Sequence, residues 1–369
     1  MRVGVIGGGQ LARMMVPPAI ALGIDIRVLA EVDGSSAAIA ATAVGDYTDA
    51  ATVLAFARDV DVITFDHEHV PQDVLAALVA EGVVVRPAPD ALAVAQDKLV
   101  MRRRLTAIDA PVPDWAEVAD AAQLGAFLAD HGGRAVVKTP RGGYDGKGVR
   151  VVDTADGADD WFAAGGTLLA EELVDFRREL SQLVARRPSG EVRAWPLVQT
   201  VQRDGVCAEV FAPAPEAGDL PEKARHLATR IAERLDVTGV LAVELFETAE
   251  GGLAVNELAM RPHNTGHWSI DGAVTSQFEQ HLRAVLDLPL GDPAPTAPWS
   301  VMINVLGGPE GQTMPERYPG VMADRPEVKL HSYAKTSRPG RKVGHVTATG
   351  DEFDDALARA RAAAAFFQG

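Results

Sequence analysis

Two glutamates in neighbouring apolar segments of the 369-residue sequence could together bind a cation. Glu244 lies in LAVELF and Glu257 in LAVNELA, and the AEGG stretch between them, residues 249–252, is typical of a hairpin turn. If Glu250 and Gly251 form a two-residue loop, the two glutamates pair directly and project from the same face. Carboxylates so placed repel each other unless a proton or a cation lies between them, and Mg²⁺ with nucleotide phosphates is the natural occupant. The alternative is two exposed acids on a solvated sheet face.

The segment that follows Glu257 adds hydrogen-bond donors. It reads MRPHNTGHW, residues 260–268, and Arg261, His263 and Asn264 offer forked and single donors suited to a planar anion. A lone histidine is more often structural, but His263 adjoins the expected metal pair.

A second group of candidate residues surrounds a glycine-rich stretch. Residues 135–140 read as a strand that contains Lys138, and RGGYDGKG, residues 141–148, separates it from another strand-like run. This is not a Walker A loop, because no Ser or Thr follows Lys147 and no helix begins there. A flexible glycine loop beside a strand lysine can close over nucleotide phosphates with its backbone N–H groups. A surface hairpin with solvated charges explains this stretch equally well when it is taken alone.

The chain after this loop could bind the rest of a nucleotide. Residues 168–174 form an extended segment that can present backbone groups to an adenine edge, and the carboxylate of Glu179 can hold ribose hydroxyls. This is a weak signal that gains force only beside the others.

The N-terminal GGGQLA, residues 7–12, supports two interpretations. It follows a strand-like run and precedes a helical one, and Glu31 lies about twenty residues on, as in a dinucleotide-binding fold. These residues alone indicate an NAD-dependent enzyme. A helix N-terminus binds anions in general, however, so a phosphorylated substrate fits equally well.

The elements that would position these residues fall into three regions. Strand-like and helical runs alternate up to residue 85, which indicates βαβ units and a parallel sheet. A basic helix at 97–104 then leads to antiparallel pairs typical of an α+β domain: 135–139 with 149–153, 167–171 with 180–186, and 239–246 with 253–260. After the proline-rich 292–298 we expect strands near 301–306, 328–334 and 343–347 and a helix from Phe353. We therefore expect domains at 1–93, 94–290 and 291–369.

Composition limits the class of protein. Lys and Arg number 35 against 51 Asp and Glu, so the net charge of −16 would repel nucleic acid and anionic membranes. Residues 328–350 nevertheless carry five Lys and Arg and no acid, which suits small phosphorylated ligands. The single cysteine, Cys207, excludes an internal disulfide and fits a core residue in a reducing compartment, and no 18-residue apolar run is present. We expect a cytoplasmic protein.

Together these residues resemble the ATP-grasp fold, and more closely the 5-(carboxyamino)imidazole ribonucleotide synthetase family of purine biosynthesis. The stretches that carry the resemblance are GGGQLARM from Gly7, GGYDGKG from Gly142, ELAMRPHNTGHW from Glu257 and SRPGRKVGHV from Ser337. They span essentially the whole chain in the family's order. The resemblance implies an N-terminal Rossmann-like parallel sheet, a central ATP-grasp domain with a mobile lid at about 112–175, and a small C-terminal β-rich domain.

The resemblance also implies a reaction. Bicarbonate attacks the γ-phosphate of ATP to form carboxyphosphate, whose breakdown delivers carbon dioxide to the amine of 5-aminoimidazole ribonucleotide. ATP and Mg²⁺ are the expected cofactors, and since the family is commonly dimeric we expect a homodimer.

Roles for individual residues follow from the same resemblance. ATP would be bound by Lys98, Lys138, Gly143, Gly146, Gly148, Glu171, the backbone from Glu172 to Val174, Glu179, Gln202 and Asn256. Mg²⁺ would be held by Glu244 and Glu257. Bicarbonate and the substrate amine would be surrounded by Tyr144, Arg261, His263, Asn264 and Lys342. The ribonucleotide would be bound by Gly9, Gln10, Glu68, Tyr144, Asp145, Lys147, Lys335 and Arg341.

The sequence departs from the family at two places. Gln199 and Gln202 replace the usual Glu and His, which leaves that histidine's nucleotide contact open, although Gln202 can still form a hydrogen bond. Phe65-Asp66 replaces Phe-Glu, a shortening that we expect to lie outside direct contact.

Three other functions compete with this one. An NAD-dependent oxidoreductase leaves the Lys138 loop and the glutamate pair unexplained. A formate-using ribonucleotide transformylase shares the nucleotide apparatus but not the RPHN-GHW context. A non-catalytic nucleotide-binding regulator is disfavoured because the candidate ligands are intact.

Overall fold

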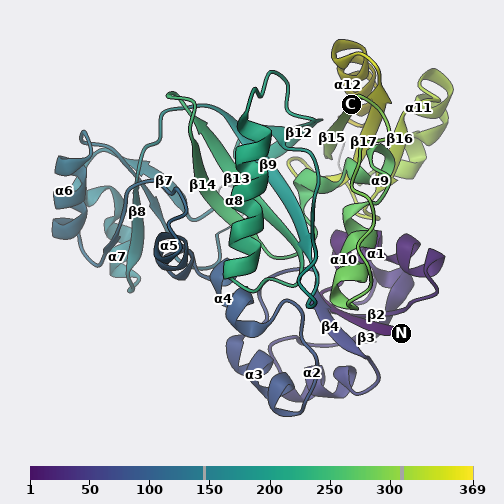
Figure 1. Ribbon diagram of the computed structural model, residues 1–369, viewed down its shortest axis with the longest axis horizontal. Helices are drawn as coiled ribbons and strands as arrows, with labels where there is room; N and C mark the ends of the chain where they lie inside the picture. The colour runs from purple at the N-terminus through teal and green to yellow at the C-terminus, as the bar shows by residue number, and fades with distance from the viewer. Residues whose placement is uncertain (144–146, 308–310, 369) are drawn as a thin grey trace.

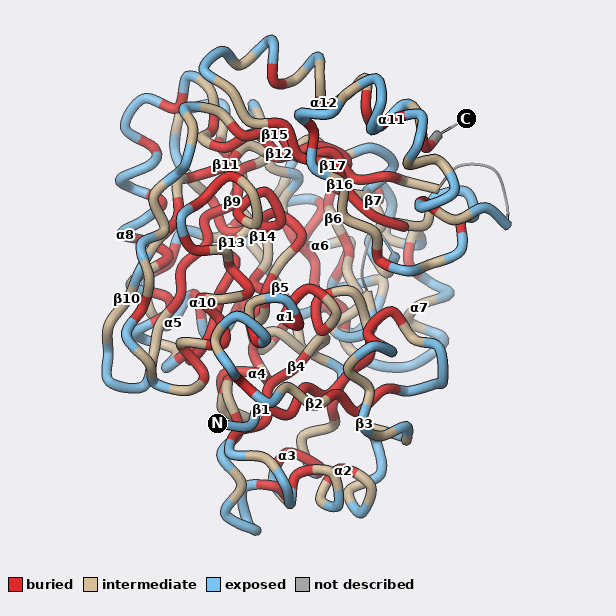
Figure 2. Tube along the Cα trace, turned by 90° about the vertical axis from the view of Figure 1, so that its right-hand side faces the viewer, coloured by how far each residue is buried: buried red, intermediate tan, exposed pale blue. Residues whose placement is uncertain are grey.

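The computed structural model describes residues 1–143, 147–307 and 311–368. Its framework is a parallel N-terminal sheet, an antiparallel outer sheet and a nine-stranded central sheet. In Figure 1 the N-terminal sheet lies at the bottom, the outer sheet at the left and the C-terminal strands at the upper right. Buried residues concentrate along the strands of the central sheet (Figure 2).

The N-terminal region is a parallel sheet of order β3-β2-β1-β4, which confirms the predicted βαβ units. β1 is buried from Val3 to Ile6, because a parallel strand covered on both faces is apolar throughout. β3 has no counterpart among the predicted elements, since its short ATAV sequence is half exposed. The elements are β1 (Arg2–Ile6), α1 (Gln10–Ala21), β2 (Asp25–Ala30), β3 (Ala41–Val44), α2 (Ala50–Ala57), β4 (Val62–Phe65), α3 (Gln72–Ala80) and α4 (Pro89–Gln96).

The outer sheet has the order β5-β8-β6-β7 and follows the basic helix α5 (Lys98–Ala107). The predicted pairing of β6 with β7 is confirmed, with Ala135 opposite Val152. The elements are β5 (Trp115–Val118), α6 (Ala121–Asp130), β6 (Ala135–Lys138), β7 (Val149–Val152), α7 (Asp159–Ala163) and β8 (Leu168–Glu172).

The predicted pairing of 167–171 with 180–186 is wrong. β8 pairs with β5 and β6 in the outer sheet, whereas β9 (Phe176–Arg186) pairs with β11 and β13 in the central sheet. The connection between them, residues 173–175, has no residue at positive φ and no glycine, both of which favour a tight hairpin. It therefore carries the chain from one sheet to the other.

The central sheet runs β14-β13-β9-β11-β12-β15-β17-β16, with β10 beside β9. The C-terminal strands continue this sheet rather than forming their own, since Ile303 of β15 pairs with Glu209 of β12. The strands are β10 (Val192–Ala194), β11 (Val198–Arg203), β12 (Val206–Ala212), β13 (Gly239–Thr248), β14 (Leu253–Ala259), β15 (Trp299–Leu306), β16 (Lys329–Ser332) and β17 (Lys342–Gly350). The helices are α8 (Leu220–Arg234), α9 (Ser269–Gly272), α10 (Gln277–Val285), α11 (Tyr318–Asp324) and α12 (Phe353–Gln368), and 3₁₀ turns occur at Ala38–Ala40, Ala155–Ala158, Asn264–Gly266 and Met314–Arg317.

Alternation along β13 separates two cores and sets the direction of Glu244. Leu241 and Val243 pack in the cluster that contains α8, whereas Val240 and Ala242 pack in the cluster that contains the Ala284 methyl of α10. Because side chains alternate along a strand, Glu244 lies on the α10 face. Its side chain is partly exposed there, so this face is open beyond the helix.

Candidate active site

The predicted carboxylate pair is confirmed. Glu244 of β13 lies directly opposite Glu257 of β14. The predicted turn is wrong, however: the Thr248 N–H donates to the Gly252 carbonyl, so the loop has three residues, Ala249-Glu250-Gly251. A β-bulge next to Glu244 inserts one extra residue into β14 and offsets the longer loop. The longer loop and the bulge shift the strand register by one residue in opposite directions, so the two glutamates still pair as predicted.

Asn256 is the extra residue of this bulge, and its polar groups face the phosphate-binding candidates. The Asn256 side-chain oxygen accepts a hydrogen bond from Lys138 Nζ at 3.2 Å, and its carbonyl accepts one from Arg102 at 2.7 Å. Its neighbour Glu257 accepts a hydrogen bond from Lys98 Nζ at 2.6 Å. The bulge thus lets consecutive residues of one strand contact two different lysines.

Arg102, Glu171 and Lys138 form a buried ion cluster at the junction of the outer and central sheets. Glu171 Oε2 lies 2.6 Å from Lys138 Nζ, and Glu171 Oε1 accepts a hydrogen bond from Arg102. Burial alone would raise the pKa of Glu171, but Lys138 and Arg102 together lower it below its ordinary value. Glu171 is therefore a charged anchor for both cations. Arg102 is absent from the predicted site, although its i+4 spacing from Lys98 puts both side chains on one helix face.

Glu244 is held differently from its partner. Burial and the nearby Glu257 carboxylate raise the pKa of Glu244 to about 7. His263 Nε2 lies 3.3 Å from Glu244 Oε1. Burial, with Arg261 and Lys342 nearby, lowers the pKa of His263 well below its ordinary value, so the imidazole is neutral. The Thr265 N–H donates a hydrogen bond to His263 Nδ1, and the Thr265 hydroxyl lies 2.9 Å from the same atom. The proton of the neutral ring is therefore on Nε2, which faces Glu244.

Asn264 follows His263 and is the clearest candidate for direct ligand contact. The residue is 9% exposed, its side-chain oxygen and nitrogen form no hydrogen bond to an oxygen or nitrogen of the described residues, and the side chain interacts with the Cys207 thiol. A thiol is a weak hydrogen-bond partner for an amide, so a bound ligand would be a stronger one. Cys207 lines the same cleft, and because burial raises the pKa of its thiol to about 12, it is a core residue and not a nucleophile.

The main-chain N–H groups of the N-terminal glycines already donate hydrogen bonds to carboxylates of the same chain. Asp66 accepts hydrogen bonds from the Gly9 and Ala12 N–H groups at 2.8 and 2.7 Å, and so caps α1. Glu31 accepts the Gly8 N–H at 3.0 Å and lies 3.1 Å from His67 Nε2. The hydrogen bond from His67 is the main reason that the pKa of Glu31 falls to about 2. Asp66 lines the cleft, and its carboxylate accepts the N–H groups that an external anion would otherwise bind, while the expectation that it does not contact the ligand stays a prediction.

Two contacts join the N-terminal region to the other regions at this end of the cleft. Glu68 accepts a hydrogen bond from Arg261 Nε at 2.7 Å, and Gln10 accepts one from Lys335 Nζ at 2.6 Å. The predicted ribonucleotide residues therefore converge from three separate parts of the sequence, and Arg341, Lys342 and Lys147 line the same cleft.

The expected adenine and ribose residues also line the cleft. Glu172, Val174, Glu179 and Gln202 line it, and burial raises the pKa of Glu179 even though Gln202 donates to it. Gln199 instead accepts a hydrogen bond from Arg178 at 3.1 Å.

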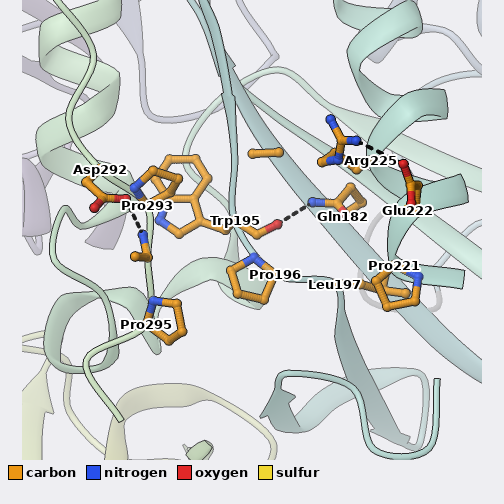
Figure 3. A pocket seen from close by; sticks show the side chains of 12 residues that line it. Gln182, Trp195, Pro196, Leu197, Pro221, Glu222, Arg225, Asp292, Pro293 and Pro295 are labelled. Carbon is orange, nitrogen blue, oxygen red and sulfur yellow. Dashed lines mark hydrogen bonds and ion pairs between the residues drawn. The ribbon is translucent and has the colours of Figure 1, made fainter. Parts of the chain in front are cut away.

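One cleft of about 1320 Å³ therefore brings together almost all the predicted residues that the structure describes. The exception is Gly148, which closes the glycine hairpin: a Cβ there would lie 2.4 Å from the Thr139 hydroxyl. Tyr144, Asp145 and Gly146 lie outside the described residues. A smaller depression of about 440 Å³ around Trp195, Pro196 and Pro293 contains none of the predicted residues (Figure 3).

The donor set constrains what the cleft can bind. Among residues 1–143, 147–307 and 311–368, no group of three or more His, Cys, Asp or Glu is arranged to hold a metal. A carboxylate pair fits Mg²⁺, which commonly takes one or two carboxylates together with substrate phosphates and water.

None of the helices in the described part of the chain is long and apolar enough to cross a membrane.

Comparison with known families divides the chain into three matching parts. The family model of a ribonucleotide synthetase preATP-grasp domain matches residues 1–96, that of the ATP-grasp domain residues 103–278, and that of the phosphoribosylaminoimidazole carboxylase C-terminal domain residues 300–359.

Known relatives resemble the chain over nearly its full length. It is 53% identical to the N5-carboxyaminoimidazole ribonucleotide synthase of Mycobacterium bovis, covering 98% of this chain and 86% of the relative. It is 50% identical to that of Corynebacterium ammoniagenes, covering 99% and 91%. The crystal structure of the Thermus thermophilus synthetase superposes with a TM-score of 0.87 at 38% identity, covering 97% of both chains. That of the Aspergillus clavatus synthase with ADP and 5-aminoimidazole ribonucleotide gives 0.90 at 31% identity, covering 99% and 98%.

Proposed function

Because the chain belongs to the N5-carboxyaminoimidazole ribonucleotide synthases, we propose that its cleft carboxylates 5-aminoimidazole ribonucleotide with bicarbonate and ATP. The chain is an ATP-grasp ligase of purine biosynthesis. One observation carries the proposal: the neutral His263 and the Asn264 amide adjoin the Glu244–Glu257 pair. This arrangement combines a site for nucleotide phosphates with donors for a small planar anion.

The proposed reaction has two steps. A bicarbonate oxygen attacks the γ-phosphorus of ATP, and ADP leaves, which gives carboxyphosphate. Carboxyphosphate breaks down to phosphate and carbon dioxide, and the substrate amine adds to the carbon dioxide and loses a proton. The products are N5-carboxyaminoimidazole ribonucleotide, ADP and phosphate.

The lysines bind and orient the nucleotide phosphates in this proposal. Lys138 is fixed by Glu171 and Asn256, and Lys98 by Glu257, so both ammonium groups are placed before ATP arrives. Preorganised cations stabilise the charge that develops on a transferring phosphoryl group. Of the other predicted ATP residues, Gly143 lines the cleft beside the lysines, and Glu179 and Gln202 would bind the ribose.

Glu244 and Glu257 would hold Mg²⁺. Burial, and after it the adjacent Glu257 carboxylate, raise the pKa of Glu244 to about 7, and a divalent cation would offset the repulsion between the two carboxylates. When bound, Mg²⁺ supplies charge neutralisation at the phosphates.

The bicarbonate end rests on the loop after β14. His263 presents an N–H and Asn264 a side-chain amide, and Arg261 and Lys342 provide the positive charge nearby. We propose that these groups, with Tyr144, hold bicarbonate and then carboxyphosphate away from water, since that intermediate hydrolyses readily.

The ribonucleotide would bind where Glu68, Gln10 and Lys335 meet. Glu68 would accept hydrogen bonds from the ribose hydroxyls, and the basic residues Lys147, Lys335 and Arg341 would bind the phosphate, with Gly9 and Asp145 completing the site.

We further propose that the protein is a homodimer, which sedimentation velocity tests.

Substrate dependence tests the proposed function. ADP formation should reach its full rate only with both bicarbonate and 5-aminoimidazole ribonucleotide, and formate should not replace bicarbonate. With ¹⁸O-labelled bicarbonate, label should appear in the released phosphate. Equal ADP formation with formate would overturn the assignment, and unlabelled phosphate would exclude carboxyphosphate.

A further inference from the structure

The loop after β14, residues 260–268, contains the predicted catalytic residues and is here called the catalytic loop. Gln277, the first residue of α10, contacts the backbone of this loop on the side away from the cleft. Its side chain is fully buried, and it does not line the cleft. Its Oε1 accepts the His263 N–H at 2.8 Å, and its Nε2 donates to the His263 carbonyl at 2.7 Å. The amide therefore pairs with both main-chain groups of a single residue, as a neighbouring β-strand would.

The same amide also fixes the far end of the loop. Gln277 Nε2 lies 2.9 Å from His267 Nδ1. The main-chain N–H of Gln277 donates to the Ser269 hydroxyl, and that hydroxyl donates to the Gly266 carbonyl. Burial lowers the pKa of His267 well below its ordinary value, so its neutral ring can accept this hydrogen bond at Nδ1. Both protons of the Gln277 amide are thus used, and only one orientation of the amide satisfies all three partners.

The loop is packed tightly onto this side chain. A Cβ added to Gly266 would lie 2.5 Å from Gln277 Oε1 and 2.3 Å from a Leu183 methyl. Gly266 is therefore required for the loop to approach the amide, and the GH pair in the RPHN-GHW stretch has a structural explanation.

We propose that Gln277 is a positioning residue that keeps carboxyl transfer coupled to ATP cleavage. This inference rests on the proposed function. Gln277 fixes the backbone of His263, whose imidazole reaches Glu244, and thereby the adjacent Asn264 amide. The phosphate-binding lysines lie on other elements, so a loosened loop leaves ATP binding in place, and the carboxyphosphate that still forms is lost to water before carboxyl transfer.

The chain offers a closely matched control in the same helix. Gln280 is also fully buried, and it pairs with both main-chain groups of a single residue, Gly291, at 2.7 and 2.9 Å. Gly291 does not line the cleft. Gln277→Met and Gln280→Met therefore both remove two hydrogen bonds to the main chain of one residue, and Gln277→Met also removes the one to His267, but only the Gln277 site supports the catalytic loop.

The experiment measures carboxylated product per ADP, together with kcat and the KM for ATP. For Gln277→Met we expect the product-to-ADP ratio to fall roughly 10-fold or more and kcat for product to fall about 10- to 100-fold, because small displacements of reacting groups cost this much. The KM for ATP should change less than about 2-fold, and Gln280→Met should keep the wild-type ratio. A wild-type ratio in Gln277→Met, or an equal loss in both variants, would overturn the proposal.

A second variant covers the case in which Gln277→Met does not fold. Gln277→Glu keeps the volume and the contact to the His263 N–H, but a carboxyl group has at most one proton and so cannot donate to both the His263 carbonyl and His267 Nδ1, and it should show the same uncoupling. If both Gln277 variants fail to fold while Gln280→Met folds, the residue is structural and the proposal is wrong. Failure of the proposed function appears separately, as wild-type protein that makes no carboxylated product.

Discussion

Glu244 lies directly opposite Glu257 across the β13–β14 pair, and this proximity adds to burial in raising the pKa of Glu244 to about 7. The two carboxylates are held unequally: Glu257 has an ion pair with Lys98 at 2.6 Å, whereas Glu244 faces the neutral His263. A negative charge on Glu244 is therefore disfavoured where it stands, as expected for a pair that binds a cation.

Glu244→Gln should stabilise the ligand-free protein at high pH. Between the ordinary pKa of 4.5 and about 7, the folded protein retains a proton that the unfolded chain has released, so the free energy of unfolding falls as pH rises through this window. The variant removes this loss, and we expect a gain on the order of 1 kcal/mol at pH 8 and almost none at pH 4.5. Urea denaturation at both pH values measures it. The exposed Glu250→Gln at the hairpin tip should change neither value, and equal effects of the two variants would refute this account.

Glu257→Gln should abolish turnover and leave the fold intact. The substitution removes a carboxylate from the expected Mg²⁺ pair and one contact of Lys98, and losses of at least about 100-fold in kcat are typical when such electrostatic stabilisation is removed. Steady-state kinetics over a Mg²⁺ titration, with circular dichroism as the check on folding, measures the effect. Near-normal kcat together with an unchanged Mg²⁺ concentration for half-maximal activity would show that Glu257 does not bind the metal.

Arg102→Met should destabilise the protein strongly. Glu171 is 3% exposed at its side chain, and removing one of its two cations leaves a buried charge undercompensated, which typically costs about 3–5 kcal/mol. The next residue provides a control: Arg103 pairs with Glu117 at the surface, so Arg103→Met should cost no more than about 1 kcal/mol.

A double mutant separates charge from packing in this cluster. Since Glu171→Gln removes the undercompensated charge, it should restore part of the stability that Arg102→Met loses. Thermal denaturation of the four proteins gives the coupling energy. Simple additivity of the two losses would show that packing, and not charge, explains the effect.

The sequence predicts the fold and the contacts of this site unequally. Alternation and the hairpin signal are sufficient to place Glu244 opposite Glu257, but they give the wrong loop, because a bulge that adds Asn256 has no sequence signature of its own. Apolar runs identify β8 and β9 as strands but do not say which sheet each joins, since that depends on packing between distant segments. Contacts through buried amides and carboxylates, such as those of Gln277 and Asp66, depend on geometry that no local pattern encodes.

Gly9→Ala should destabilise the N-terminal region through Asp66. A Cβ at this position would lie 2.0 Å from Asp66 Oδ2, and the carboxylate could not keep its hydrogen bonds to the Gly9 and Ala12 N–H groups. Loss of a helix cap together with local overpacking predicts a cost of roughly 2 kcal/mol or more. In an Asp66→Ala background the clash is absent, so adding Gly9→Ala should cost much less, and equal costs in both backgrounds would contradict this explanation. Glu31 already accepts the Gly8 N–H, and Asp66 accepts the Gly9 and Ala12 N–H groups. The wild-type protein should therefore show no energy transfer from tryptophan to NADH, and observed transfer would show that the glycine cluster binds a dinucleotide.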